Sequence, residues 1–453
     1  MERTIKLEAR SGWGEVETIE VGRLKRRVVG LTAGEVGLTL AEGKDLLSEL
    51  QRLVLQTQME EYTMCARVGS ECLTLRRQCD CRTRTIQTLF GTVEVDAPRI
   101  SICPCSSEIG FVDLSFSPLA QFFPDRCTPE LRRIHAELGA RHSFREAAQL
   151  LSTLLPCSPT NHATIRNRTH RIAVEIEATA PEAPKDVPAS NDEMVVIIDG
   201  AHIRAAPGYQ SRHLDVTVGK VEVRGRRPRR FALAPKGSDH PLTPMRAALL
   251  EQGWYPGRPL AVISDGEAAL PNLVRAAAGE PVCHILDWFH LSMRMRQIEQ
   301  ILMGLSARHL RNPEPVQAAQ ASIERVRHLI WHGRQDQADL EIALLSGYGR
   351  KIAERNGVFV QESTNDLTRL CKELQGYAQN NRDSIINYHR RYHGKQPVSS
   401  SRAEACVDEI ANARMGKKQR MRWSPRGTHR VATVRAAVLD GRLTSHGVIP
   451  LAA

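Results

Sequence analysis

Two aspartates stand directly after runs of largely apolar residues. Asp199 follows residues 194–198, and Asp265 follows residues 260–264. Such a run, apolar on both faces, predicts a strand buried in a sheet that helices cover. Neighbouring strands that end at one edge bring their last side chains together, and converging carboxylates repel unless a divalent cation neutralises them. Each aspartate alone would be typical of a turn or a cap, but the repetition predicts a metal-binding edge.

A third candidate acid comes much later in the chain. A strand predicted at residues 282–286 is followed by Asp287 and His290, and then by a long helical stretch over about 291–396. After that stretch a new helix is expected, with Glu404 in its first turns. A third acid can therefore return to the sheet edge after a helical insertion. Asp408, four residues further on, would share the same helix face and is the alternative third acid.

The order of the elements predicts the fold class. Three strands come first, then a helix, a fourth strand and a second helix, with acids closing the first and fourth strands. This order is the RNase H-like arrangement, which serves two-metal phosphodiester chemistry. We expect an α/β protein with an RNase H-like mixed sheet and a long all-helical insertion, preceded by a small β unit and a helical domain.

Cysteine pairs bracket a β-hairpin predicted around Gly91. The four residues are Cys79, Cys81, Cys103 and Cys105. Thiolates from two turns can hold a structural Zn²⁺ tetrahedrally. Zinc ribbons favour at least two residues between paired ligands, whereas both pairs here are C-x-C. Structural zinc and free thiols therefore both remain open.

A helical region over about 128–176 has the features of a DNA-binding domain. Ser143, with Glu146 three residues on, forms a capping-box pattern, and Ser158 before Pro159 predicts the start of the next helix. Two helices joined by a short turn resemble a helix-turn-helix. The candidate DNA contacts on the second helix are Arg166, Arg168 and Arg171. A plain helical hairpin with a solvated basic face is the alternative.

Two further basic clusters lie close in sequence to the candidate acids. The first contains Arg226, Arg227, Arg229 and Arg230; the second contains Lys417, Lys418, Arg420 and Arg422. Clusters this dense suggest contacts with phosphates, with an affinity that falls steeply in salt. A solvated charge run is the alternative. Trp423, beside the second cluster, could stack on a base or pack against the sheet.

The composition narrows the functional classes. The chain has 453 residues, with 62 Lys and Arg against 51 Asp and Glu, and a formal net charge of +11. This excess favours a polyanion, above all nucleic acid, as the partner. No apolar run approaches the ~18 residues of a membrane span, and the first residues lack a signal-peptide core. The 11 cysteines are too few for a disulfide framework, so we expect a cytoplasmic location.

The pattern also predicts the domain organisation. A proline-rich stretch without apolar periodicity predicts the clearest linker. The expected parts are an N-terminal strand and helix region (1–70), a small β domain (71–126), a helical DNA-binding domain (127–180), the linker (181–192), the first part of a catalytic core (193–290), a helical insertion (291–396), and the completion of the core with a basic C-terminal region (397–453).

In this order the motifs resemble the DDE transposases of bacterial insertion sequences, most closely the Kra-type group and more distantly the Mutator-like transposases. The resemblance covers roughly residues 72–440. It rests on TLFGTVEV with its flanking cysteines, SFREAAQLL, VVIIDGAHIR, AVISDGEAAL, DWFH and SRAEACVDEIANARMGKKQRMRWSPRGTHR.

The resemblance implies an activity and its residues. Asp199, Asp265 and Glu404 match the catalytic acids and would hold two Mg²⁺ or Mn²⁺ ions, while Asp287 and His290 would support the site. The activity would be cleavage of transposon ends and strand transfer into target DNA. The partners would be double-stranded DNA and further copies of the chain, in the bacterial nucleoid.

Two other functions remain open on the sequence. A regulator or an inactive transposase would bind DNA without cutting it. A metal phosphohydrolase acting on small substrates also uses aspartates at strand ends, but it leaves the basic clusters unexplained.

Overall fold

The computed structural model describes residues 2–10, 16–26, 29–30, 32–33, 36–68, 75–102, 115–123, 125–157, 160–181, 192–400, 405–419, 421–444 and 447–448. The chain divides into two compact units, residues 1–172 with 443–449 and residues 173–442 with 450–453. The division falls inside helix α5 (His162–Ala178). Most of the predicted linker, residues 182–191, lies outside the described residues.

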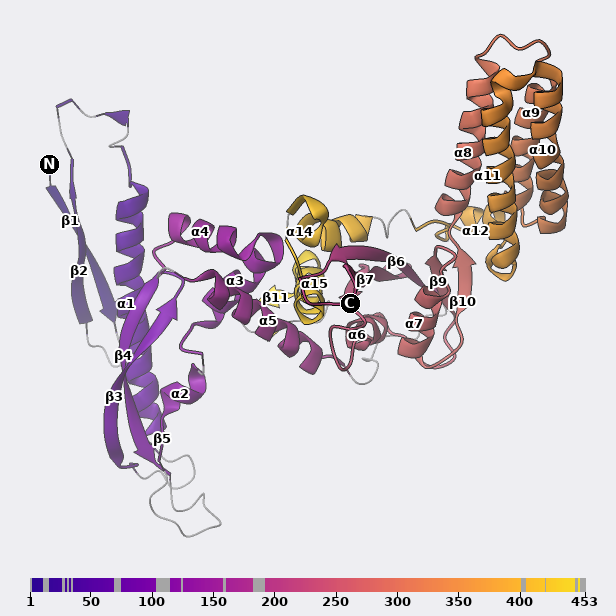
Figure 1. The fold of residues 1–453 in the computed structure, drawn as a ribbon. Coiled ribbons are helices and arrows are strands. Elements are labelled where there is room, and N and C mark those ends of the chain that lie inside the picture. Colours follow the sequence, from indigo (N-terminus) through magenta and orange to yellow (C-terminus); the bar gives the residue numbers. More distant parts are fainter. Residues whose placement is uncertain are drawn as a thin grey trace. The chain divides into compact units, whose positions relative to one another are not determined.

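The first unit begins with two β-hairpins separated by a long helix (Figure 1). β1 (Glu2–Arg10) pairs with β2 (Val16–Lys25), and α1 (Leu40–Ala66) follows. β3 (Gln78–Thr88) and β4 (Gly91–Ser101) form the hairpin predicted around Gly91. α1 packs against β4, and their apolar side chains share one core. β5 (Ser115–Phe116) and the short helix α2 (Pro118–Phe122) complete this part.

Three helices follow in the same unit, namely α3 (Pro129–Arg141), α4 (Phe144–Leu154) and α5. Ser143 caps α4 as predicted, because its hydroxyl accepts a bond from the backbone N–H of Glu146. α5 begins later than the sequence predicted, at His162. The side chain of Asn161 accepts a bond from the N–H of Ala163 at 2.9 Å and so occupies the capping role. Ser158 and Pro159 lie outside the described residues.

The described residues of the second unit contain a mixed five-stranded sheet in the order β10-β9-β6-β7-β8. Its strands are β6 (Met194–Arg204), β7 (His213–Val223), β8 (Arg229–Leu233), β9 (Leu260–Ser264) and β10 (Cys283–Leu286). β6, β7 and β8 are antiparallel, whereas β9 runs parallel to β6 and β10 runs parallel to β9. The predicted α/β class with a mixed sheet is confirmed.

The first strand is longer than the sequence predicted. Its pairing with β9 stops at Ile197, but its pairing with β7 continues to Arg204. The antiparallel partner therefore extends β6 five residues past Asp199. This extension was not predicted, because the run of apolar residues stops before Asp199. The backbone hydrogen bonds between β6 and β7 continue beyond it to Arg204.

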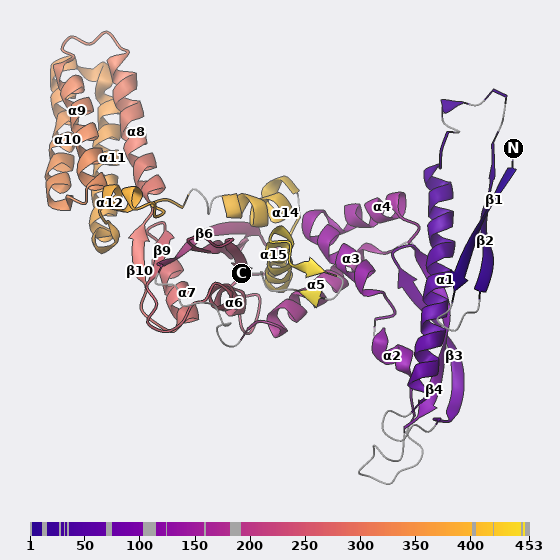
Figure 2. The same ribbon diagram turned by 180° about the vertical axis from the view of Figure 1, so that it is seen from behind.

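Helices cover both faces of the sheet (Figures 1 and 2). On one face, α6 (Thr243–Glu251) and α7 (Ala269–Ala278) pack on Val196, Ile198 and Val262. On the other, Ile197, Ile263 and Ile285 share a core with a bundle of helices. The bundle consists of α8 (Trp288–Ser306), α9 (Glu314–Trp331), α10 (Gln335–Asn356), α11 (Gln361–Asn380) and α12 (Tyr388–His393). The stretch predicted as helical is therefore helical, and its core is continuous with that of the sheet.

The chain then returns to the sheet. A π-helical turn, η5 (Val407–Asn412), packs against β6 and β7 and runs into α14 (Ala413–Met415) and η6 (Lys417–Gln419). α15 (Pro425–Leu439) packs against β8. The short strands β11 (Leu443–Thr444) and β12 (Gly447–Val448) pair with each other and belong to the first unit. Among the described residues, no helix is both long and apolar enough to cross a bilayer.

Candidate active site

Asp199 and Asp265 lie at the same level on neighbouring parallel strands. Ile197 on β6 is aligned with Ile263 on β9, and each aspartate is two residues further along its chain. Alternate residues of a strand share a face, so both aspartates follow the side of the sheet that packs against the bundle. Adjacent strands are ~4.8 Å apart. The register therefore aligns the two residues across the parallel pair, although β6 continues past Asp199 and does not end there as predicted.

Both carboxylates are partly exposed and are oriented by backbone bonds. Asp199 Oδ1 accepts from the N–H of Gly200 at 2.7 Å, and Asp265 Oδ1 accepts from the N–H of Glu267 at 3.1 Å. The end of α11 lies close behind Asp265. A Cβ at Gly266 would come within 2.6 Å of Asn381 and 2.9 Å of Tyr377. A side chain at position 266 would therefore have to displace Asn381 and Tyr377.

Asp287 comes next in the same alignment and has a different environment. Leu286 is aligned with Ser264, so Asp287 lies at the level of Asp265 on the third parallel strand. Its side chain is fully buried and caps α8, accepting from the N–H of Phe289 at 2.9 Å. It also accepts from the N–H of Ser400 at 2.8 Å and from the Ser400 hydroxyl. Burial alone would raise the pKa of Asp287, but these bonds and one from His290 hold it below its usual value.

His290 is the hydrogen-bonding partner of Asp287. Its Nδ1 lies 2.7 Å from Asp287 Oδ2, one turn along α8. This bond raises the pKa of His290 against the opposing effect of burial, and the nearby charges of Asp265 and Asp199 raise it further. His290 therefore lies within electrostatic reach of both candidate acids. The predicted supporting pair is in contact and lies beside the two aspartates.

Glu404 lies outside the described residues, which end at Ser400 and resume at residue 405. Its described neighbours on both sides are attached to the sheet. Ser400 is bonded to Asp287, and the buried Cys406 leads into η5, which packs on β6. The alternative acid Asp408 is exposed and accepts from the side chain of Asn412 at 2.7 Å.

The donor set suits a hard cation. Carboxylate oxygens are the preferred ligands of Mg²⁺ and Mn²⁺. Among the described residues, no group of three or more histidines, cysteines, aspartates or glutamates is arranged to hold a metal ion. Asp199 and Asp265 are two oxygen donors of this kind, and Glu404 lies outside the described residues.

The first basic cluster is mostly structural. Arg229 is only 4% exposed, and it pairs with Glu251 at 2.5 Å and with Asp440 at 2.7 Å. Arg230 pairs with Asp440 at 3.0 Å and with Glu409 at 3.1 Å. These bonds attach α15 and η5 to β8, so the two arginines are engaged within the protein and do not fit the predicted phosphate contact.

The rest of that cluster lies away from the acids. Arg226 donates to the carbonyl of Gln252 at 3.2 Å, and Arg227 is exposed. Both belong to the turn after Val223, which pairs with Met194 at the start of β6. This turn adjoins the start of β6, five residues before Asp199 along the strand. Proximity in sequence to a candidate acid did not imply proximity to the site.

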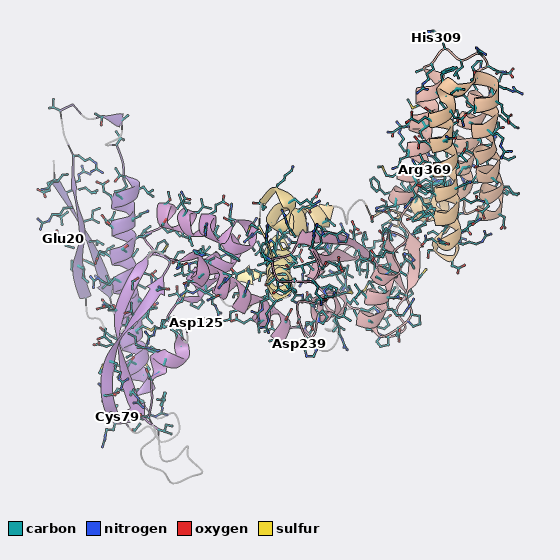
Figure 3. The ribbon with its side chains drawn as sticks, in the orientation of Figure 1. Glu20, Cys79, Asp125, Asp239, His309 and Arg369 are labelled. Carbon is teal, nitrogen blue, oxygen red and sulfur yellow. The ribbon has the colours of Figure 1, made fainter. Side chains whose placement is uncertain are left out.

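The arginines of α5 have three different environments. Arg166 is exposed. Arg168 is 8% exposed and donates to His135 Nδ1 at 2.9 Å and to the side chain of Gln87 at 2.6 Å. Arg171 forms an ion pair with Asp125, which is labelled in Figure 3. Only Arg166 keeps the freely exposed guanidinium that the helix-turn-helix interpretation requires.

The remaining predicted residues are placed as follows. Cys79 and Cys81 are exposed free thiols within β3, and Cys79 is labelled in Figure 3. Their predicted partners Cys103 and Cys105 lie outside the described residues, as does Arg420. Lys417, Lys418 and Arg422 are exposed. Trp423 is 5% exposed and lies under the guanidinium of Arg414, so it packs against the protein instead of offering a ring to a base.

Sequence reasoning missed three residues that shape the site. Ser400 binds Asp287 across the whole helical insertion. Tyr377 borders Gly266, and Arg294 on α8 lies over its ring at 4.1 Å from the centroid. No local pattern distinguishes these residues, because each contact joins segments about 80 or more residues apart in sequence. Pairing of distant segments is visible only in the fold.

Comparison with known proteins gives no independent assignment. No model of a known protein family matches this chain, and no curated protein matches it significantly. Functional conclusions rest on the residues and their geometry.

Proposed function

We propose that this chain is a metal-dependent DNA transposase that cuts the ends of its own mobile element and joins them to target DNA. The observation that carries the proposal is the alignment of Asp199 and Asp265 on adjacent parallel strands, with Asp287 and His290 beside them. The strand order β10-β9-β6-β7-β8, with the first strand at the centre, supports an RNase H-like core.

In this proposal Glu404 completes the site. Only three residues separate Ser400 from Glu404 in the sequence, and Glu404 directly precedes the helix that begins at residue 405. The length of the chain therefore keeps Glu404 close to both of these attached positions. Asp199, Asp265 and Glu404 would then hold Mg²⁺ or Mn²⁺. When bound, the metal would activate the attacking hydroxyl group and stabilise the leaving oxygen of the phosphodiester.

The other residues would orient the reactants. Asp287 fixes the start of α8 and engages His290 at Nδ1, which leaves Nε2 for a phosphate oxygen. Since the pKa of His290 is raised, the ring carries a positive charge over a wider pH range than a free histidine. A cation at this edge would favour the approach of the DNA backbone to two carboxylates that would otherwise repel it.

Strand cleavage tests the proposal. The substrate is labelled double-stranded DNA carrying the ends of the flanking element, with Mg²⁺ or Mn²⁺. Wild type is compared with Asp199→Ala, Asp265→Ala, Glu404→Ala and Asp408→Ala. Asp239→Ala is the matched control, because Asp239 is an exposed carboxylate elsewhere in the same unit (Figure 3).

We expect cutting to disappear in the first three variants and to survive in Asp408→Ala and Asp239→Ala. A loss in Asp408→Ala with activity kept in Glu404→Ala would reassign the third acid. DNA binding without metal-dependent cutting in the wild type would reject the enzyme and favour a DNA-binding regulator.

A further inference from the structure

A groove of about 480 Å³ lies at the end of the β6–β7 hairpin, outside the candidate active site. Its polar lining comes from two segments that are far apart in sequence. The residues that matter here are Arg204, Tyr209, Arg212, His213, Lys417 and Arg422. The described residues that line the groove are cationic or neutral, and none of them is a carboxylate.

Backbone bonds hold the two segments together. Trp423 donates its N–H to the carbonyl of Arg204 at 3.0 Å, and Ala206 donates to the carbonyl of Trp423 at 2.8 Å. This bridge places Arg422 beside Arg204. On the other side, Ala205 donates to the carbonyl of Arg212 at 2.9 Å. The arginines are therefore brought together by the fold, with the buried indole of Trp423 as an anchor.

The cations of the groove have no counterion among the residues that the structure describes. Arg204, Arg212, Lys417 and Arg422 are exposed, and none of them forms an ion pair with a described residue. This differs from Arg229 and Arg230, whose charges are neutralised by three carboxylates. Four uncompensated positive charges around one groove repel one another and favour a polyanion that would neutralise them.

The size and lining fit a nucleic acid better than a single small anion. A volume of about 480 Å³ lies in the range of pockets that take drug-sized ligands. Tyr209, at the tip of the hairpin, is 47% exposed and carries a hydroxyl group that can donate to a phosphate oxygen. Arginine and lysine side chains together with tyrosine hydroxyls are among the donors that proteins use to contact the DNA backbone.

The groove lies further along the strand that carries the candidate active site. Arg204 and Asp199 belong to β6 and are five residues apart, so their side chains leave opposite faces of the sheet and only the distance along the backbone is compared. At about 3.3 Å per residue this corresponds to roughly 17 Å. Since duplex DNA rises about 3.4 Å per base pair on each strand, the distance equals roughly five base pairs.

We propose that this groove binds the DNA backbone about five base pairs from the phosphate that is cut. The spacing rests on the proposed function, because it takes Asp199 as the position of cleavage. Binding of DNA by the groove does not depend on cleavage, and the two statements can therefore fail separately.

The test compares two charge-matched double variants of the full chain. Arg204→Gln with Arg212→Gln removes two groove charges. Arg224→Gln with Arg246→Gln removes two exposed arginines from the β7–β8 turn and from α6. Affinity for double-stranded DNA that carries the element's end is measured from 50 to 200 mM salt. The measurement is repeated with duplexes that extend from zero to ten base pairs beyond the cleavage position. Thermal unfolding of each variant verifies that it is folded.

The groove variant should bind at least ~10-fold more weakly, and its salt slope should fall by about 2, since each phosphate contact contributes roughly 0.9. Wild-type affinity should rise once the duplex reaches about five base pairs on one side, and the groove variant should not show this rise. Equal losses in both double variants, or no loss in either, would overturn the groove assignment.

The outcomes separate the two proposals. If cleavage depends on Asp199 but the groove variant binds DNA as well as wild type, the groove proposal is rejected and the proposed transposase function stands. If the groove variant binds DNA more weakly but neither wild type nor any variant cleaves it, the transposase proposal is rejected and the groove stands as a DNA-binding site. Tighter binding of RNA than of DNA through the same arginines would replace the proposed ligand.

Discussion

The carboxylate of Asp287 accepts bonds from Phe289, His290 and Ser400, and it is buried directly after the edge strand β10. The pair with His290 has a defined pH dependence. Because the pKa of His290 is raised in the folded protein, the pair stabilises the fold fully below the unfolded value of about 6.5, and this stabilisation is lost as the pH rises through the raised value.

Asp287→Asn should therefore lower the pKa of His290, because the amide cannot accept the imidazole N–H and also bind Ser400 and Phe289. The variant should lose about 3 kcal/mol of stability at pH 6 and less at pH 9. NMR titration of the His290 ring and urea unfolding at both pH values measure this.

Asp215→Asn is the matched control for Asp287→Asn. Asp215 also contacts a histidine, His202 at 3.0 Å, but both side chains are about three-quarters exposed. The control should change stability by less than about 1 kcal/mol. An unchanged titration of His290 in Asp287→Asn would show that the carboxylate does not control the ring.

At the scale of the elements, the attachment of α15 and η5 to the sheet depends on buried charges. Asp440 at the end of α15 is fully buried and accepts from Arg229 and Arg230 of β8. η5 follows the segment that carries Glu404, and its Glu409 binds Arg230. The ion-pair network therefore positions the helix that precedes the basic residues and follows the proposed third acid.

Asp440→Ala should destabilise the protein by about 3–5 kcal/mol, because it removes one of the two carboxylate partners of the buried Arg229 and of Arg230. Asp336→Ala is the control, since Asp336 pairs with Arg382 but is 90% exposed, and it should cost less than about 1 kcal/mol. Chemical denaturation measures both. Equally small losses of stability in Asp440→Ala and Asp336→Ala would mean that Glu251 alone is a sufficient partner for the charge of Arg229.

The sequence allowed some elements to be predicted and not others. Apolar runs identified β9 and the core of β6, because burial on both faces leaves a local signal. The predicted end of β6 was wrong, because the strand continues as far as it pairs with β7. Arg229 and Arg168 looked like surface cations, because their partners are distant in sequence. The assignment of the candidate acids stays a prediction, and Asp199 lies within β6, not after it. Ser400 was not predicted at all.

At the scale of the whole molecule, the sheet and the bundle form one core. Ile197 and Ile263 of the sheet belong to the same apolar cluster as Leu291 and Met295 of α8. Apolar side chains that share one interior lose their burial together. The bundle is therefore joined to the sheet by packing as well as by the chain.

The two parts should consequently unfold together. Native-state hydrogen exchange should give the slowest amides of β9 and of α11 the same opening free energy and the same denaturant dependence. Leu302→Ala, in the part of the core that the bundle supplies, should lower both values by a similar 2–5 kcal/mol. A fall confined to α11 would show that the bundle opens as a separate domain.

The two ends of the helical insertion meet at a single point. Trp288 donates to the carbonyl of Val398 at 3.1 Å, and Asp287 binds Ser400. Because the insertion leaves and rejoins the sheet at one place, lengthening it should disturb the sheet little. The entropic cost of closing a loop grows by only about 0.6 kcal/mol for each doubling of the loop length. The turn between α8 and α9, at the far end of the bundle where His309 is labelled in Figure 3, is thus the place where a reporter domain could be grafted without disturbing the acids.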